Sequence, residues 1–236
     1  EDIMLIQYFD WYLSSKDQLW QTLKNDAAHL KSLGVTGVWM PPAYKGTKGL
    51  LDAGYGVYDL YDMGEFDQKG SVPTKYGTQE EYAEAIRALK DEGIAVIADV
   101  VLNHRLGADD REKVEVLSMD PNQRSLVKGE KTISAWTKFL FPNRKNQYSS
   151  FKWNHNHFTS VDYDADRNES GLYLFKDKEW AANIDIELEN YDYLMGADVD
   201  FKNDEVIEEY QRWGQWYVDT YDLDGFRLGA IKHIDF

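Results

Sequence analysis

Two stretches of the chain place polar side chains directly after strand-like sequence. Residues 94–101 are apolar and lead into an Asn-His-Arg run, and residues 225–228 lead into a basic run. Amide oxygens suit hard cations, guanidinium groups pair with carboxylates, and imidazoles hydrogen-bond ligands. An ordinary core strand followed by a basic loop explains the second stretch about equally well when it is taken alone. The side chains concerned are those of Asn103 and His104 after the first stretch, of Arg227 within the second, and of Lys232 and His233 after it.

The elements that must position these groups alternate between strand and helix. We expect strands over residues 3–11, 35–40, 94–101 and 225–228, the last of them buried. Helical spacing follows residues 19–33, a capping box opens a second helix at Thr78, and Asn203 is the expected cap of a third. This alternation predicts a parallel α/β architecture. From residue 103 to about 201 the rhythm stops, and short β-like segments such as residues 172–175 indicate an inserted subdomain.

The composition limits the classes of partner. With 236 residues, 43% of them hydrophobic, the chain can bury a substantial core. Lys and Arg number 26 against 42 Asp and Glu, and the resulting net charge of -16 argues against nucleic acid and anionic membranes as partners. The absence of cysteine excludes disulfides and thiolate metal sites. The 8 Trp and 16 Tyr provide faces that pack on sugars, although core packing is the commoner use of such residues.

Two motifs carry a resemblance to a known family. Residues 99–104 read Asp-Val-Val-Leu-Asn-His, and residues 225–233 read Gly-Phe-Arg-Leu-Gly-Ala-Ile-Lys-His. In this order they resemble the motifs that close the third and fourth barrel strands of the α-amylase family of glycoside hydrolases. The likeness continues through residues 37–46, 54–62 and 190–195 and so covers essentially the whole chain.

The resemblance implies a fold of the α/β class, a (β/α)8 TIM-type barrel of which this chain carries the first four strands, with a β-rich subdomain inserted after the third. We expect residues 1–102 and 203–236 to form the first half of the barrel and residues 103–202 to form an inserted calcium-binding subdomain. A closed barrel needs about 250 residues without insertions, so the second half is not in this sequence. Either a longer chain, a second half-barrel or another copy of the chain must then cover the open strand edges.

The resemblance also implies a retaining α-amylase that cleaves internal α-1,4-glucosidic bonds of starch, glycogen or maltodextrins. Gly229 stands where the family has its nucleophilic aspartate, and the general acid comes from a later strand, so we expect this chain to be inactive as written. Arg227 is then placed to pair with a nucleophile carboxylate. Substrate-binding positions by resemblance are Tyr55, His104, Lys232 and His233, and Asp99 is a structural carboxylate below the site.

Calcium is the cofactor that the resemblance implies. Its expected ligands are Asn103, Asp192, Asp198 and the backbone carbonyl of His233. Aspartates that bind further metals in some relatives are replaced here by Thr159 and Ala181, so a single calcium ion is expected. His155 and His157 form a weak zinc pattern for which local packing is the better explanation.

Two further hypotheses remain open at this level. The chain could be a catalytically silent homologue that binds α-glucans, or a calcium-stabilised half-barrel that assembles with a partner. Residues 157–164 resemble the cytoplasmic branch of bacterial α-amylases, which favours a cytoplasmic location over secretion with removal of a signal peptide.

Overall fold

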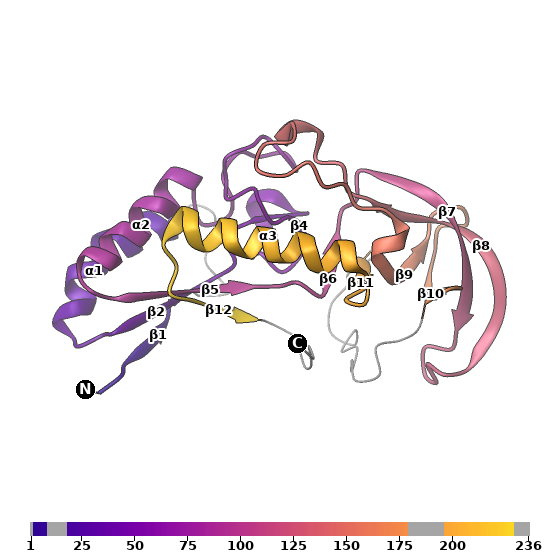
Figure 1. Cartoon of the computed structure of the whole chain (residues 1–236), viewed down its shortest axis with the longest axis horizontal. Coiled ribbons are helices and arrows are strands. Elements are labelled where there is room, and N and C mark those ends of the chain that lie inside the picture. The colour runs from indigo at the N-terminus through magenta and orange to yellow at the C-terminus, as the bar shows by residue number, and fades with distance from the viewer. Residues whose placement is uncertain (1, 9–17, 179–195, 229–236) are drawn as a thin grey trace. The chain divides into compact units, whose positions relative to one another are not determined.

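The computed structural model describes residues 2–8, 18–178 and 196–228 (Figure 1). These residues form two compact units. The first takes its described residues from Glu1–Val101, Asn143–Ser149 and Tyr210–Gly229, and the second takes them from Leu102–Pro142 and Ser150–Glu209. The predicted insertion, residues 103–202, differs from the second unit in two segments: residues 143–149 belong to the first unit, and residues 203–209 belong to the second.

The first unit is built on a four-stranded parallel sheet. Its strands lie in the order β1-β2-β5-β12, so each new strand is added beside the preceding one. Helices α1 (Leu19–Ser32), α2 (Gln79–Asp91) and α3 (Asp204–Tyr221) come between successive strands, and α1 packs beside α2 (Figure 1). The strands are β1 (Leu5–Gln7), β2 (Gly37–Met40), β5 (Ala95–Val100) and β12 (Gly225–Leu228). This is the strand order of the first half of a (β/α)8 barrel.

Local sequence signals set the starts of two helices as predicted. Thr78 caps α2 by accepting the backbone N–H of Glu81, and the Glu81 carboxylate accepts the N–H of Thr78, which completes the capping box. At α3 the Oδ1 atom of Asn203 accepts the N–H groups of Glu205 and Val206. At α1 the N-cap is Gln18, whose side chain makes no capping hydrogen bond.

The expectation that residues 225–228 form a buried strand is wrong in one respect. The strand is present, but Arg227 and Leu228 are exposed, with 37% of Leu228 accessible. The reason is that β12 pairs only with β5 in the described part of the chain, so it is an edge of the sheet. At the opposite edge Leu5 of β1 is 52% exposed.

The second unit is a six-stranded antiparallel sheet in the order β6-β11-β9-β10-β7-β8. The predicted β-like segment at residues 172–175 is the end of β10, and the long pair β7 and β8 forms an extended hairpin. The strands are β6 (His104–Leu106), β7 (Asp110–Met119), β8 (Val127–Lys138), β9 (Phe158–Asp164), β10 (Glu169–Phe175) and β11 (Gly196–Val199).

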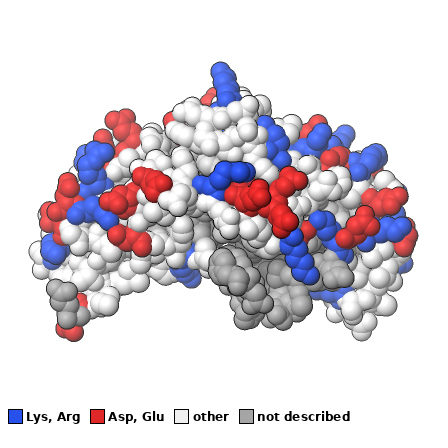
Figure 2. Space-filling model, in the orientation of Figure 1, with Lys and Arg blue, Asp and Glu red and all other residues white. Residues whose placement is uncertain are grey.

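Short elements complete the described chain. A two-stranded hairpin, β3 (Lys45–Gly46) with β4 (Val57–Asp59), belongs to the first unit. Single 3-10 turns lie at Gly49–Leu51, Pro142–Arg144 and His155–His157. In the described residues no helix is both long and apolar enough to span a membrane. Acidic side chains are interspersed with basic ones over the face shown in Figure 2.

Candidate functional site

Asp99 is the centre of a polar cluster in the first unit. It lies on β5 with no exposed surface, directly opposite Arg227 in the register of β12. The hydroxyl of Tyr55 donates a hydrogen bond to Oδ2 of Asp99 over 3.0 Å, and Nη1 of Arg227 donates to the same oxygen over 3.3 Å. Two residues that the sequence analysis selected, Tyr55 and Arg227, are therefore held on the carboxylate of a third.

Burial and pairing oppose each other at Asp99. Burial raises the pKa of this carboxyl, while hydrogen bonds from Tyr55 and Arg227 and the charge of Arg227 favour the ionised form. Burial and the nearby Asp99 together raise the pKa of Tyr55, so Tyr55 remains a hydrogen-bond donor at neutral pH.

Trp39 is a site residue to which the sequence analysis gave no role. Its ring lies under the Arg227 guanidinium, with 3.7 Å between the guanidinium carbon and the ring centroid. This cation–π contact and the bond to Asp99 fix a side chain that is still 49% exposed. Arg227 is thus oriented by its neighbours and accessible to a further carboxylate. The position of Trp39 in a strand next to Pro41 was the available signal, but it also suits core packing.

The hairpin that carries Tyr55 is arranged around the Asp52 carboxylate. Oδ1 of Asp52 accepts the N–H groups of Gly54 (2.9 Å) and Gly56 (3.2 Å), and Oδ2 accepts that of Lys48 (3.1 Å). A Cβ atom added at Gly46 would lie 2.2 Å from Cγ of Asp52, so only glycine fits there. The spacing Asp-x-Gly-x-Gly is a turn signal that could have identified Asp52.

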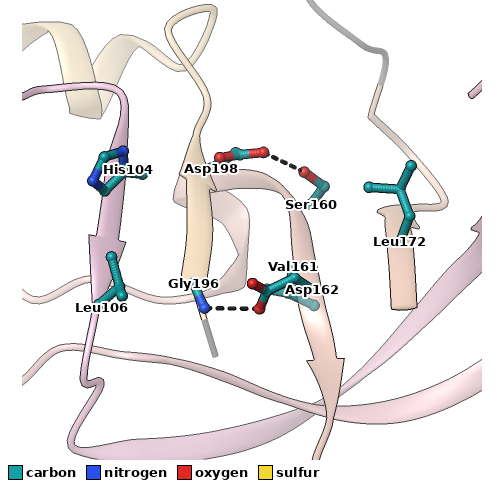
Figure 3. A pocket seen from close by; sticks show the side chains of 8 residues that line it. All are labelled: His104, Leu106, Ser160, Val161, Asp162, Leu172, Gly196 and Asp198. Carbon is teal, nitrogen blue, oxygen red and sulfur yellow. Dashed lines mark hydrogen bonds between the residues drawn. The ribbon is translucent and has the colours of Figure 1, made fainter. Parts of the chain in front are cut away.

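A second polar group lies in the second unit around a cavity of about 40 Å³. His104 on β6 and Asp198 on β11 are opposite each other in the strand register, and Ser160 on β9 donates to Oδ2 of Asp198 over 3.0 Å (Figure 3). Burial raises the pKa of Asp198, while His104 and the Ser160 hydrogen bond lower it. The cavity is lined by His104, Leu106, Ser160, Val161, Asp162, Leu172, Gly196 and Asp198.

Asn103 supplies an oxygen atom that no donor among the described residues satisfies. Its Oδ1 is buried and accepts no hydrogen bond from these residues, whereas its backbone carbonyl accepts the N–H of Val199 over 3.0 Å. A buried acceptor of this kind is costly unless a donor or a cation satisfies it. Within the described ranges, no group of three or more His, Cys, Asp or Glu residues is arranged to hold a metal ion.

The predicted site residues divide between what the structure describes and what it does not. Tyr55, Asp99 and Arg227 meet in the first unit, while Asn103, His104 and Asp198 lie in the second. The predicted positions that lie outside the described residues are Gly229, Lys232, His233 and Asp192.

His155 and His157 face different carboxylates. Nδ1 of His155 is 2.8 Å from Glu112, and Nε2 of His157 is 3.2 Å from Glu205. The His157 ring also packs on Phe151 and Trp153. These contacts are those of locally packed side chains.

Comparisons with known proteins agree with this architecture. The chain is 52% identical to an α-amylase of Geobacillus stearothermophilus over 235 residues, which cover 98% of this chain and 43% of the relative. It is 50% identical to an α-amylase of Bacillus licheniformis, covering 98% of this chain and 45% of the relative. It is 42% identical to the cytoplasmic α-amylase of Escherichia coli strain K12, covering 98% and 48%. The chain therefore spans less than half the length of these relatives.

Solved structures with low sequence identity to this chain share its fold. A maltogenic α-amylase from Thermotoga neapolitana aligns with a TM-score of 0.52 at 18% identity, covering 96% of this chain and 38% of that one. The sequence profile described as "Alpha amylase, catalytic domain" matches residues 20–236. On this match, and on the strand order described above, the chain belongs to the α-amylase family.

Proposed function

We propose that the full-length protein acts on internal α-1,4-glucosidic bonds of α-glucans in the manner of an α-amylase. The observation that carries this proposal is the joint attachment of Tyr55 and Arg227 to Asp99, with Asp99 and Arg227 on neighbouring parallel strands. Catalytic residues of barrel enzymes cluster at the carboxyl ends of such strands. The names of the relatives point to the same activity.

The proposed chemistry is a double displacement at the anomeric carbon. In a retaining glycosidase one carboxylate attacks while a second carboxyl group, about 5–5.5 Å away, protonates the leaving oxygen. In this proposal Arg227, oriented by Trp39 and Asp99, stabilises a carboxylate at position 229. Tyr55 and His104 hold the sugar ring, and Lys232 and His233 border the leaving-group side.

Glycine at position 229 has no group with which to attack. We propose that the protein with this residue does not hydrolyse starch. In the full-length protein, Gly229→Asp should then produce reducing-sugar release from starch, whereas Gly229→Asn, of nearly the same volume, should not. Equal release from the unsubstituted protein and from the Gly229→Asp variant would contradict the role assigned to this position.

The second candidate is an α-glucan-binding protein without hydrolysis, and Gly229 is the observation that favours it. Calorimetric titration of the Gly229→Asp variant with maltoheptaose, together with the reducing-sugar assay, distinguishes the two candidate functions. Binding of maltoheptaose without hydrolysis favours the α-glucan-binding protein, and recovered hydrolysis favours the α-amylase. An α-glucan is the expected ligand in both cases.

We further propose that one calcium ion is bound through Asn103, Asp192, Asp198 and the backbone carbonyl of His233. Two features of the described residues support this ligand set. The unpartnered Oδ1 of Asn103 needs a partner, and Asp198 is a carboxylate of the type that calcium prefers. Bound calcium would neutralise these oxygens and tie their segments together.

A cytoplasmic location is also a proposal, supported by the relative named as a cytoplasmic α-amylase. Cell fractionation with an antibody to the protein tests it against secretion. The proposals of a second half-barrel or of self-association are tested by the mass of the purified protein in solution. A particle larger than one polypeptide would support them.

A further inference from the structure

The ammonium group of Lys45 lies inside the first unit with no exposed surface. Its Nζ donates to the backbone carbonyl oxygens of Phe66 at 2.9 Å, Ser71 at 2.6 Å and Val72 at 2.9 Å. The Gln68 carbonyl at 3.4 Å and Oδ2 of Asp62 at 3.2 Å complete a shell of oxygen atoms. We call this shell, from the five residues Asp62, Phe66, Gln68, Ser71 and Val72, the Lys45 cage.

The Lys45 cage offers more oxygen atoms than an ammonium group has protons. An ammonium has three N–H donors, whereas five oxygens surround this one. Ion sites are built in a similar way, because carbonyl oxygens there replace the water around a potassium ion. The distances are too long for calcium, which takes oxygens at about 2.3–2.6 Å, and for magnesium at about 2.0–2.1 Å. The cage therefore has the dimensions for an ammonium-sized monovalent cation.

The wall of the cage is held in place by contacts that do not involve Lys45. Oδ1 of Asp62 accepts the backbone N–H groups of Gly64, Glu65 and Phe66. Its Oδ2 accepts Nε2 of Gln68, which also donates to Asp59.

Asp59 in turn is paired with the buried Arg144 over 2.8 Å. Arg144 therefore balances the charge of Asp59, and the Lys45 ammonium balances the charge of Asp62.

We propose that the Lys45 cage is a monovalent-cation site whose cation is supplied by the chain itself, and that potassium or an alkylammonium ion occupies it when the Lys45 side chain is removed. Lys45 lies on β3, at the base of the hairpin that carries Tyr55. The built-in cation thus fixes residues 66–72 against this hairpin without a metal ion. The proposal is independent of the activity proposed above.

The test is chemical rescue of Lys45→Ala in the full-length protein, with the melting temperature as the readout. Removal of one partner from a buried ion pair should lower the melting temperature by about 10 °C in choline chloride, whose quaternary cation has no N–H donor. n-Propylammonium chloride replaces the deleted atoms and should restore several degrees at the same ionic strength. Potassium chloride should restore more than sodium chloride, because the cage is too wide for the smaller ion.

Lys45→Met is the matched control, because it fills the volume without a charge. It should be destabilised in all four salts and respond to none of them specifically. If Lys45→Ala does not fold in choline chloride, the yield of folded protein after refolding in each salt replaces the melting temperature. Equal melting temperatures or equal refolding yields of Lys45→Ala in all four salts would overturn the proposal, as would a Lys45→Met variant as stable as the wild-type protein.

Discussion

The hydroxyl of Tyr55 donates to Oδ2 of Asp99 over 3.0 Å, across 44 residues of sequence. The bond joins the loop between β3 and β4 to a buried carboxylate in β5. It makes Asp99 the common support of Tyr55, proposed to bind sugar, and of Arg227, proposed to pair with a carboxylate, so both side chains have a fixed geometry before any ligand arrives.

Tyr55→Phe tests this support. The variant removes a hydrogen bond to a buried carboxylate and keeps the ring, so the free energy of unfolding should fall by about 1–3 kcal/mol. Urea denaturation provides the measurement. Tyr163→Phe is the control, because its hydroxyl contacts Asn168 at the surface and its removal should cost less than about 0.5 kcal/mol. Equal losses of stability for the two substitutions would show that the hydrogen bond from Tyr55 to Asp99 contributes no more than a surface hydrogen bond.

Gly46→Ala tests the packing around Asp52. The new Cβ would lie 2.2–2.6 Å from the Asp52 carboxylate group, which must then leave its backbone hydrogen bonds. The expected loss in the free energy of unfolding is about 3 kcal/mol. Gly129→Ala is the matched control, since a Cβ at that position meets no atom within 4 Å.

The cause can be separated from a general intolerance of Gly46 by a double-mutant cycle. With Asp52→Ala in the background, Gly46→Ala should cost much less, because the colliding carboxylate is gone. Additive losses would mean that the collision with Asp52 is not the cause.

Asn103→Ala tests the proposed calcium site, because its effect on stability should differ between EDTA and calcium. In EDTA the variant should melt at or above the wild-type temperature, because Oδ1 of Asn103 is buried and has no hydrogen-bond partner in the described part of the chain. At a calcium concentration a hundredfold above Kd, the free energy of unfolding of the wild-type protein should rise by about 3 kcal/mol. The rise for the variant should be smaller by about 1.4 kcal/mol for each tenfold loss of calcium affinity.

Asn122→Ala, an exposed substitution in the second unit, is the control and should leave the calcium gain unchanged. A gain by Asn103→Ala equal to that of the wild-type protein would remove Asn103 from the ligand set.

His157 should make the protein less stable as the pH falls. Burial lowers the pKa of His157 below its ordinary value of 6.5, although Glu205 opposes the shift. Its Nδ1 accepts the backbone N–H of Asn154 over 3.0 Å. A proton on Nδ1 would break this hydrogen bond, because two N–H donors would then point at each other. The unfolded state then binds the proton more readily, so the stability is complete above pH 6.5 and declines as the pH falls from 6.5 towards the folded-state pKa.

Thermal melting of the wild-type protein and of His157→Gln at a series of pH values measures the pH-dependent contribution of His157 to stability. The difference in stability between the two should shrink as the pH falls through this window. A constant difference would show that His157 does not titrate differently in the folded and unfolded states.

The sequence by itself determined the features that depend on neighbours along the chain. The capping box at Thr78, the Asn203 cap and the strand at residues 225–228 follow from residue type and spacing, and the family follows from the motifs at residues 99–104 and 225–233. Such signals are local because a helix cap or a strand period involves atoms only a few residues apart.

Only the tertiary structure decided which distant groups meet. Arg227 reaches Asp99 across 128 residues because the parallel register of β5 and β12 places them opposite each other. Lys45, in an Ala-Tyr-Lys-Gly run that reads as a polar loop, is fully buried because five oxygens from residues 62–72 surround its ammonium. Burial and ion pairing of this kind depend on the final packing, and no pattern along the chain encodes them.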